Sequence, residues 1–302
     1  MCPTYWSAVV SDLARSYRDS SGQCNNLARA AIRYAFHDAA AYSSKTPFYP
    51  PAAGGADGSL LLSPTEINRP DHDGLRDFHN TLKQKLQDYK AAGYGISAAG
   101  TVLLKGRIGP CDQLSADFDT DLIQVAGSIG VLACPGGRIG RVDVGRSDTS
   151  VEAPDGLLPL SFGPGSDHDT IYALFVDKGF SARDLAALVG AHSTAFANFQ
   201  TANGIPAGTP LDDTPGVWDV AYYNQTYFPP AGIGRLDSDI NLSKNASSAV
   251  GRQFKSFVNA QGAWAVSFQS AQQALSLLGV PASVRKGMQD CSVVVNNAYS
   301  RV

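Results

Sequence analysis

The chain has 302 residues, of which 44% are hydrophobic and 17% are charged, a balance typical of a globular protein with a substantial core. Because 24 lysines and arginines nearly balance 27 aspartates and glutamates, the chain has no basic field for a phosphate backbone, and nucleic acid is not an expected partner. No segment approaches the roughly 20 consecutive apolar residues of a membrane span, and no apolar leader follows the amino end. We therefore expect neither a membrane anchor nor a signal peptide in this sequence.

Apolar residues recur far more often with the 3.6-residue period of an α-helix than with the two-residue period of a strand. In chain order, helices are expected over residues 6–17, 25–42, 74–92, 121–134, 169–178, 182–199 and 249–278. Before the sixth of these helices, Ser181 and Asp184 have the spacing of a capping box. Glycine- and proline-rich connections separate the helices, and no change of composition marks a domain boundary. The sequence predicts a mainly α protein with a single domain over residues 1–302.

Cysteines and glycosylation sequons indicate the compartment. Five cysteines are few for a disulfide-dense scaffold but many for a cytosolic chain. Asn-X-Ser/Thr sequons cluster at Asn224, Asn241 and Asn245, which is typical of a glycosylated surface. Both features predict a secreted, extracellular protein whose cysteines can pair.

Two histidines lie in segments with helical periodicity. Arg33 and His37 are one helical turn apart on the same face, and such a pair suits a reaction in which the imidazole takes a proton while the guanidinium stabilises a departing anion. His192 projects from an otherwise apolar segment and is a natural axial ligand for haem iron. Taken alone, each histidine is more often an ordinary core or surface residue, so the interpretation depends on the motifs around them.

Short motifs follow one another along the chain: Arg33-x-x-Phe36-His37-Asp38-Ala39, Gly54-Gly55-Ala56-Asp57-Gly58-Ser59, Gly190-Ala191-His192-Ser193, Asp212-x-Thr214-Pro215-Gly216-x-x-Asp219 and Arg235-Leu236-x-Ser238-Asp239. In this order they resemble the plant-type haem peroxidase superfamily, and most of all its secreted fungal class (class II). The order over nearly the whole chain is more specific than any single motif. The resemblance implies a haem peroxidase fold in which haem b lies between a distal lobe, about 1–150, and a proximal lobe, about 151–302.

The resemblance also implies the roles of site residues. His37, with Arg33 and Phe36 beside it, is expected on the distal face of the haem, and His192 is expected to bind the iron. His37 would move a proton from the inner to the outer oxygen of hydrogen peroxide, while Arg33 stabilises the leaving hydroxide. Asp239 would accept the other N–H of His192 and favour the ferric resting state. Phenolic or other small aromatic donors would then return two electrons, one at a time.

Two Ca²⁺ sites follow from the same resemblance. The distal ligands are Asp38, Gly55, Asp57 and Ser59, and the proximal ligands are Ser193, Asp212, Thr214, Val217 and Asp219. Carboxylate, carbonyl and hydroxyl oxygens are the ligands that Ca²⁺ prefers. Each set begins next to a haem-site histidine, so loss of the ion is expected to loosen the segment that positions it. The alternative is that these segments are ordinary turns.

The chain departs from the family pattern at His72. Relatives place there an asparagine, held by a glutamate, that fixes the tautomer of the distal histidine, and Glu66 is the matching glutamate. A neutral imidazole accepts at one nitrogen and donates from the other, so His72 is a candidate catalytic residue that adds a second titration. We predict that activity falls at mildly acidic pH more steeply than in an asparagine variant. The alternative is a surface histidine in a loop.

Two further departures concern the substrate. Manganese-oxidising relatives carry carboxylates at the positions of Asn26, Ala30 and Asn198, and lignin-oxidising relatives carry an exposed tryptophan at the position of Ala187. The sequence therefore predicts neither a manganese site nor that exposed tryptophan. It predicts that this protein has a lower redox potential than its lignin-degrading relatives. Another tryptophan or tyrosine acting at the surface remains open.

The resemblance pairs Cys24 with Cys134 and Cys2 with Cys291, and leaves Cys111 without a counterpart. Cys111 lies in an expected insertion over residues 100–120, after which the family pattern resumes at Asp121. A retained intron is one hypothesis for this insertion, and a native surface loop is the other. A pairing of Cys2 with Cys111 that leaves Cys291 free also remains open.

The sequence as a whole predicts a secreted, monomeric haem b peroxidase with two Ca²⁺ ions, which uses hydrogen peroxide to oxidise small aromatic donors. One alternative is a non-catalytic secreted protein that keeps the scaffold and binds calcium. Another is a manganese- or lignin-type peroxidase that uses an unrecognised surface site.

Overall fold

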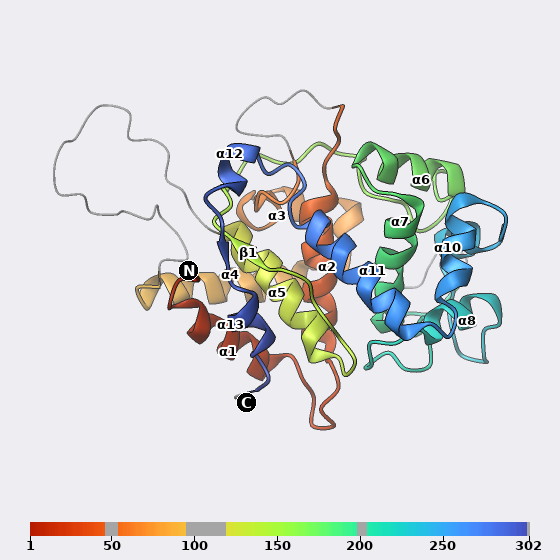
Figure 1. Cartoon of the computed structure of the whole chain (residues 1–302), viewed down its shortest axis with the longest axis horizontal. Helices are drawn as coiled ribbons and strands as arrows, with labels where there is room; N and C mark the ends of the chain where they lie inside the picture. Colours follow the sequence, from red (N-terminus) through yellow and green to blue (C-terminus); the bar gives the residue numbers. More distant parts are fainter. Residues whose placement is uncertain (46–53, 95–118, 198–203, 301–302) are drawn as a thin grey trace.

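The computed structural model describes residues 1–45, 54–94, 119–197 and 204–300, which form a mainly helical protein (Figure 1). The first half of the chain contains α1 (Trp6–Ser16), α2 (Asn26–Ala40), α3 (Ser59–Leu62), the 3-10 helices η1 (Glu66–Asn68) and η2 (Pro70–His72), α4 (Arg76–Ala91), α5 (Asp119–Ala133) and β1 (Asp143–Val144). The second half contains α6 (His168–Asp177), α7 (Ala182–Val189), η3 (Gly190–Thr194), α8 (Ala221–Tyr227), α9 (Asp237–Ser243), α10 (Ala249–Phe257), α11 (Gln261–Leu275), α12 (Ala282–Arg285), β2 (Gln289–Asp290) and α13 (Ser292–Asn296). The prediction of a mainly α fold is confirmed.

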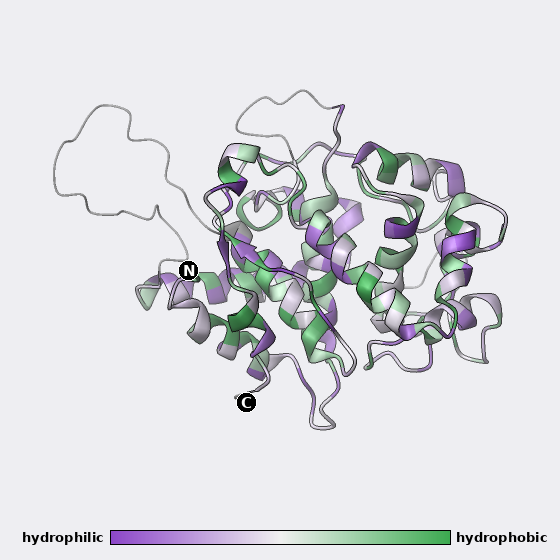
Figure 2. Ribbon diagram, viewed as in Figure 1, coloured by the Kyte–Doolittle hydropathy of each residue, from purple (hydrophilic) through white to green (hydrophobic). Residues whose placement is uncertain are grey.

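The helices α2 and α5 pack closely at the centre of the molecule. Two glycines of α5 make the approach possible, because a Cβ on Gly127 would lie 2.5 Å from the Cβ of Ala35 and a Cβ on Gly130 would lie 2.6 Å from the carbonyl oxygen of Ala28. Alanines on α2 supply the matching small surface. In Figure 2, α5 is coloured mostly green and white, in agreement with its buried position. This contact fixes the helix that carries Arg33 and His37.

The helices α7, α8, α10 and α11 share an aromatic core beside this pair, to the right of α2 in Figure 1. The indoles of Trp218 and Trp264 stack with their ring centroids 5.2 Å apart. Gly190 ends α7 against this core, where a Cβ would lie 2.3 Å from the hydroxyl of Tyr223 and 2.4 Å from Nε1 of Trp264. The close packing sets the position of the turn that begins there and carries His192.

Two expected helices are shorter in the structure than predicted. The helix expected over 182–199 keeps its capping box at Ser181 but ends at Val189, and η3 then leads into extended backbone at Ala195. The segment 249–278 forms two helices, α10 and α11, because Asn259 adopts a left-handed conformation with φ of 56°. Periodicity alone missed both breaks because the apolar residues stay in phase across them.

The carboxyl-terminal segment returns to the first half of the chain. Its strand β2 pairs antiparallel with β1, and α13 packs against α1 and α5. A disulfide joins Cys2 to Cys291, and a second joins Cys24 to Cys134. The structure therefore does not adopt the alternative pairing of Cys2 with Cys111. This last segment therefore lies beside helices of the first half of the chain.

The expected insertion over residues 100–120 lies largely outside the described residues, and Cys111 does so entirely. The described chain resumes with α5, which contains Asp121. Within the described ranges, none of the helices combines the length and apolarity needed to cross a membrane.

Candidate active site

A cavity of about 920 Å³ is lined by residues of α2 and by residues of α7 and η3. Arg33, Phe36 and His37 reach it from α2, and His192 reaches it from η3. Many of the other lining residues are apolar, among them Leu158, Ile171, Phe175, Leu188, Leu211 and Leu242. This volume, lined by apolar side chains with a few polar groups, is typical of a site for a large organic cofactor. The structure thus brings the two histidine motifs, far apart in the sequence, to one site.

On the α2 side of the cavity, Arg33 donates a hydrogen bond from Nε to Nε2 of His37 over 3.1 Å. Burial and the neighbouring Arg33 charge hold the pKa of His37 well below its usual value, so His37 is a neutral base near pH 7. Burial lowers the pKa of Arg33 to about 10, which leaves the guanidinium charged. The Phe36 ring meets His37 edge-on and stacks on Phe175. The pair therefore combines a neutral base with a fixed positive charge.

The ring of His72 lies against His37, with the two Nδ1 atoms 3.0 Å apart. His72 is buried, so the alternative of a surface histidine is wrong. The expected glutamate contact is absent: within the described residues, Oε2 of Glu66 accepts from the backbone N–H of Ala153 and Oε1 has no partner. His72 therefore contacts the distal histidine without the support of Glu66.

On the η3 side, Nδ1 of His192 lies 3.1 Å from each carboxylate oxygen of Asp239, which comes from α9. Asp239 is buried, with 1% of its side chain exposed, whereas the His192 side chain is 32% exposed toward the cavity that it lines. The sequence placed His192 on an apolar helix, but the structure places it in the 3-10 turn that follows α7. A histidine held by a carboxylate at one ring nitrogen has the arrangement of a metal-ligating histidine.

The residues predicted as distal calcium ligands converge next to α2. Asp38 and Ser59 are buried and Asp57 is half-buried, and Oδ1 of Asp38 and Oγ of Ser59 have no hydrogen-bond partner within the described chain. Burial raises the pKa of Asp57 to about 7, and burial together with the Asp57 charge raises that of Asp38. Gly55 has φ of 105°, and its carbonyl oxygen accepts from the backbone N–H of Asp57 over 2.8 Å. Unpaired oxygens and crowded carboxylates are the conditions that a bound cation relieves.

The residues predicted as proximal calcium ligands converge next to His192. Oδ2 of Asp212 is buried and without a partner in the described chain, and burial raises the pKa of Asp212 to about 7. Ser193 donates to the carbonyl of Val217, and Thr214 donates to Asp219. Within the described residues, no three His, Cys, Asp or Glu side chains are grouped so that they could hold a metal ion. Each calcium set fits that result, because it has only two carboxylates and relies on hydroxyl and carbonyl oxygens.

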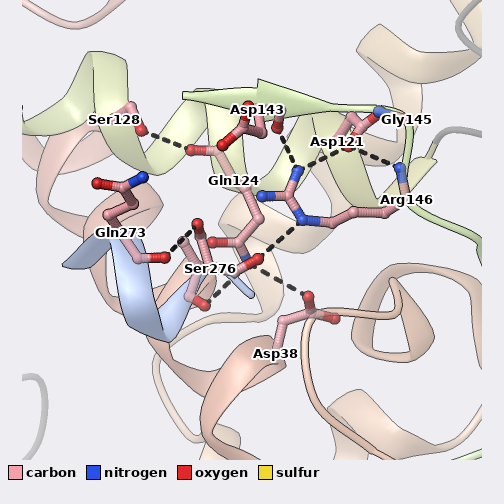
Figure 3. Close-up of polar contacts among 10 residues, drawn as sticks. Asp38, Asp121, Gln124, Ser128, Asp143, Gly145, Arg146, Gln273 and Ser276 are labelled. Atoms are coloured by element: carbon pink, nitrogen blue, oxygen red, sulfur yellow. Dashed lines mark hydrogen bonds and ion pairs between the residues drawn. The ribbon is translucent and has the colours of Figure 1, made fainter. Parts of the chain in front are cut away.

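Sequence reasoning missed a buried ion pair at the edge of the cavity, between Nη1 of Arg146 and Oδ1 of Asp121 at 2.7 Å (Figure 3). Both side chains are 1% exposed, and Arg146 also donates to the carbonyl oxygens of Asp143 and Ser276. From the next turn of α5, Gln124 donates to Asp38. The network thus links α5 and the end of α11 to the distal calcium residues. The only indication of this ion pair in the sequence is Asp121, at the point where the family pattern resumes.

The family model described as peroxidase matches residues 119–260. The chain is 30% identical to manganese peroxidase 3 of Phlebia radiata (95% of this chain and 75% of that protein) and 28% identical to a peroxidase of Arthromyces ramosus (98% and 76%). It is also 28% identical to a low-redox potential peroxidase of Taiwanofungus camphoratus, over 95% of this chain and 82% of that protein. The chain belongs to the peroxidase family, with fungal class II peroxidases among its relatives, and is an oxidoreductase.

Proposed function

We propose that this protein uses hydrogen peroxide to oxidise phenolic and other small aromatic donors in one-electron steps. One observation carries the proposal: Arg33 and His37 line the same cavity as His192, which is held by Asp239. The family supplies the reaction with peroxide, and these residues supply the groups that it needs on both sides of a bound haem.

His192 is the residue that would hold the haem iron. Because a carboxylate can only accept, the hydrogen bond to Asp239 requires a proton on Nδ1 of His192 and leaves Nε2 with a lone pair for the metal. Haem b, when bound, supplies the iron at which hydrogen peroxide is reduced and two oxidising equivalents are kept. The volume of the cavity and its apolar wall support a group of that size.

His37 and Arg33 have different roles in the reaction with peroxide. Nε2 of His37 takes a proton from one peroxide oxygen and returns it to the oxygen that leaves as water. Arg33 keeps its charge at neutral pH and stabilises the negative charge that develops on the leaving oxygen. Phe36 covers the base with an apolar ring, which limits access of bulk water.

Donors of the phenolic class are supported by what the cavity lacks. Asn26 and Ala30 line it at the two positions where manganese-oxidising relatives carry glutamates, and Asn198 lies outside the described residues. Ala187 is buried, so the place of the exposed tryptophan of lignin-oxidising relatives offers no contact with a donor. A relative of which this chain covers 82% is named a low-redox potential peroxidase. The proposal includes secretion, which the disulfides support, and two bound Ca²⁺ ions, which the unpaired oxygens support. It also includes a monomeric state.

The test begins with the absorption spectrum of the protein reconstituted with haem and calcium. We expect a Soret band that hydrogen peroxide changes within seconds and that a phenol such as 2,6-dimethoxyphenol restores. Mn²⁺ should not be oxidised with saturation, and a non-phenolic methoxylated benzyl alcohol should be a poor donor. Absence of a Soret band, or a band that peroxide leaves unchanged, would contradict the proposal. Saturable oxidation of Mn²⁺ would overturn the choice of donor.

A further inference from the structure

Two buried imidazoles form a direct pair in this site. Nδ1 of His37 and Nδ1 of His72 lie 3.0 Å apart, and the ring centroids are separated by 5.2 Å. His37 is 8% exposed and His72 is 2% exposed, so water does not replace this contact readily. One of the two nitrogens must carry the proton of the hydrogen bond, and the identity of that nitrogen decides what the pair can do.

Arg33 settles the direction of the hydrogen bond. A guanidinium has only donors, so Nε2 of His37, which lies 3.1 Å from Nε of Arg33, is an acceptor. In a neutral imidazole the other nitrogen then carries the hydrogen. His37 is therefore protonated at Nδ1 and donates to Nδ1 of His72, whose own hydrogen lies on Nε2.

The same arginine positions the segment that carries His72. Nη1 of Arg33 donates to the carbonyl of Asp73 over 2.7 Å, and Nη2 donates to the carbonyl of Asp71 over 3.2 Å. These two residues flank His72, so one guanidinium holds the backbone on both sides of this imidazole and also contacts the other imidazole. Several hydrogen bonds thus fix both imidazoles in place, and fixed partners give each ring a defined tautomer.

We propose that His72 is a positioning residue that accepts the Nδ1 proton of His37 and shares the additional proton that His37 takes up from hydrogen peroxide. The proposal rests on the proposed function, because His37 must be the base that meets peroxide. When Nε2 of His37 releases the hydrogen bond from Arg33 and gains that proton, the charged ring donates from Nδ1 to a second base, and the proton on Nδ1 can move to Nδ1 of His72. When the proton on Nε2 is given to the leaving oxygen, the Nδ1 proton returns and both rings are neutral again.

An imidazole differs from an amide in this position. An amide oxygen accepts the Nδ1 proton but does not take it up, whereas the imidazole of His72 is itself a base. The positive charge that forms during the reaction is therefore spread over two rings. The pair also depends on a second titration, that of His72, because a protonated His72 cannot accept the hydrogen bond from Nδ1 of His37.

The pH at which this happens follows from the groups around His72. On the η2 side these are Arg69, Asp73 and Asp155, and on the α2 side they are Arg33 and the neutral His37. Burial, followed by the charges of Arg33 and Arg69, lowers the pKa of His72 to about 4. His72 is thus a neutral acceptor above that value and is charged below it, so activity should fall as the pH drops through about 4. The sequence predicts that activity falls at mildly acidic pH, and the pKa of His72 in the structure places this loss of activity near pH 4.

The test compares wild type with His72→Asn and His72→Leu in the haem-reconstituted protein. The rate constant for reaction with hydrogen peroxide would be followed by stopped-flow absorbance from pH 3 to 8. We expect His72→Leu to lose between about 10-fold and 10⁴-fold at pH 7, up to the contribution of a well-placed base. His72→Asn, which keeps an acceptor, should stay within about tenfold of wild type and lose the fall near pH 4. His79→Asn, a buried histidine outside the cavity, is the matched control and should retain the wild-type profile.

A second measurement does not depend on activity. In protein loaded with diamagnetic zinc protoporphyrin and labelled with ¹⁵N-histidine, we expect a scalar coupling across the hydrogen bond between the two Nδ1 atoms. An equal peroxide rate in wild type and His72→Leu, an unchanged pH profile in His72→Asn, or no coupling between the two Nδ1 atoms would overturn the proposal. A wild-type protein that does not react with peroxide at all would instead refute the proposed function, so the two failures are distinguishable.

Discussion

Nδ1 of His192 lies 3.1 Å from both carboxylate oxygens of Asp239, although the two residues are 47 positions apart in the sequence. The carboxylate is buried and comes from α9, whereas the histidine comes from the turn after α7. Their contact requires that α9 pack near η3, and it directs the free nitrogen of the imidazole to the cavity. The proximal side of the site is therefore a product of tertiary packing.

The first prediction separates holding haem from using peroxide. His192→Ala removes the proposed iron ligand and should abolish stable haem binding, measured as the loss of the Soret band after gel filtration. Asp239→Asn keeps the ring in place but weakens its basicity, and we expect haem affinity or activity to fall by about 10–100-fold. Wild-type haem retention in His192→Ala would show that another residue binds the iron.

The second prediction concerns the distal base. His37→Leu should bind haem with an unaltered Soret intensity, while the rate constant for reaction with hydrogen peroxide falls by about 10²–10⁴-fold. Stopped-flow absorbance at pH 7 gives this rate constant directly. A loss smaller than tenfold would mean that His37 is not the base.

The third prediction concerns calcium. Metal analysis of the purified protein should find two Ca²⁺ ions per chain, and removal with a chelator should lower the melting temperature. A site filled at 1,000 times its dissociation constant stabilises the fold by about 4 kcal/mol. Asp57→Asn and Asp212→Asn should each lose one ion, whereas Asp88→Asn, an exposed aspartate on α4, should keep both. A chelated protein with an unchanged melting temperature would count against these sites.

The fourth prediction concerns the buried ion pair of Figure 3. Asp121→Asn leaves the charge of Arg146 without a carboxylate in an environment that is 1% exposed, and we expect a loss of about 3–5 kcal/mol in the free energy of unfolding. Arg76→Gln breaks an ion pair whose side chains are 52% and 43% exposed, and should cost at most about 1 kcal/mol. Urea unfolding at pH 7 measures both values, and equal losses would contradict the distinction.

The fifth prediction concerns the sequons. Asn224 and Asn245 are exposed, whereas the amide of the half-buried Asn241 donates to the carbonyl of Ser166 and accepts from Lys244. In a secretory host we expect glycans on Asn224 and Asn245 and none on Asn241. Glycosidase treatment in ¹⁸O-water followed by peptide mass spectrometry identifies the modified positions. Full occupancy of Asn241 would show that its hydrogen bonds do not protect it.

Much of this protein was predictable from sequence because the features concerned are local. Helical periodicity depends on neighbours three and four residues apart, and it located α1, α2, α4, α5 and α6 closely. The relation between Arg33 and His37 is likewise set by a single helical turn. Motif order then carried the prediction of the family.

Tertiary structure decided what depends on partners distant in the chain. The turn at Gly190 lies where the chain packs against Tyr223 and Trp264, and the break between α10 and α11 lies at the left-handed Asn259; hydrophobic periodicity predicted neither. The loss of the Glu66 contact and the Arg146–Asp121 pair were equally invisible, because the energy of a buried polar group depends on which groups surround it. The sequence by itself determined that His72 replaces an amide. Only the fold decided that its nitrogen faces His37 and that burial keeps it neutral.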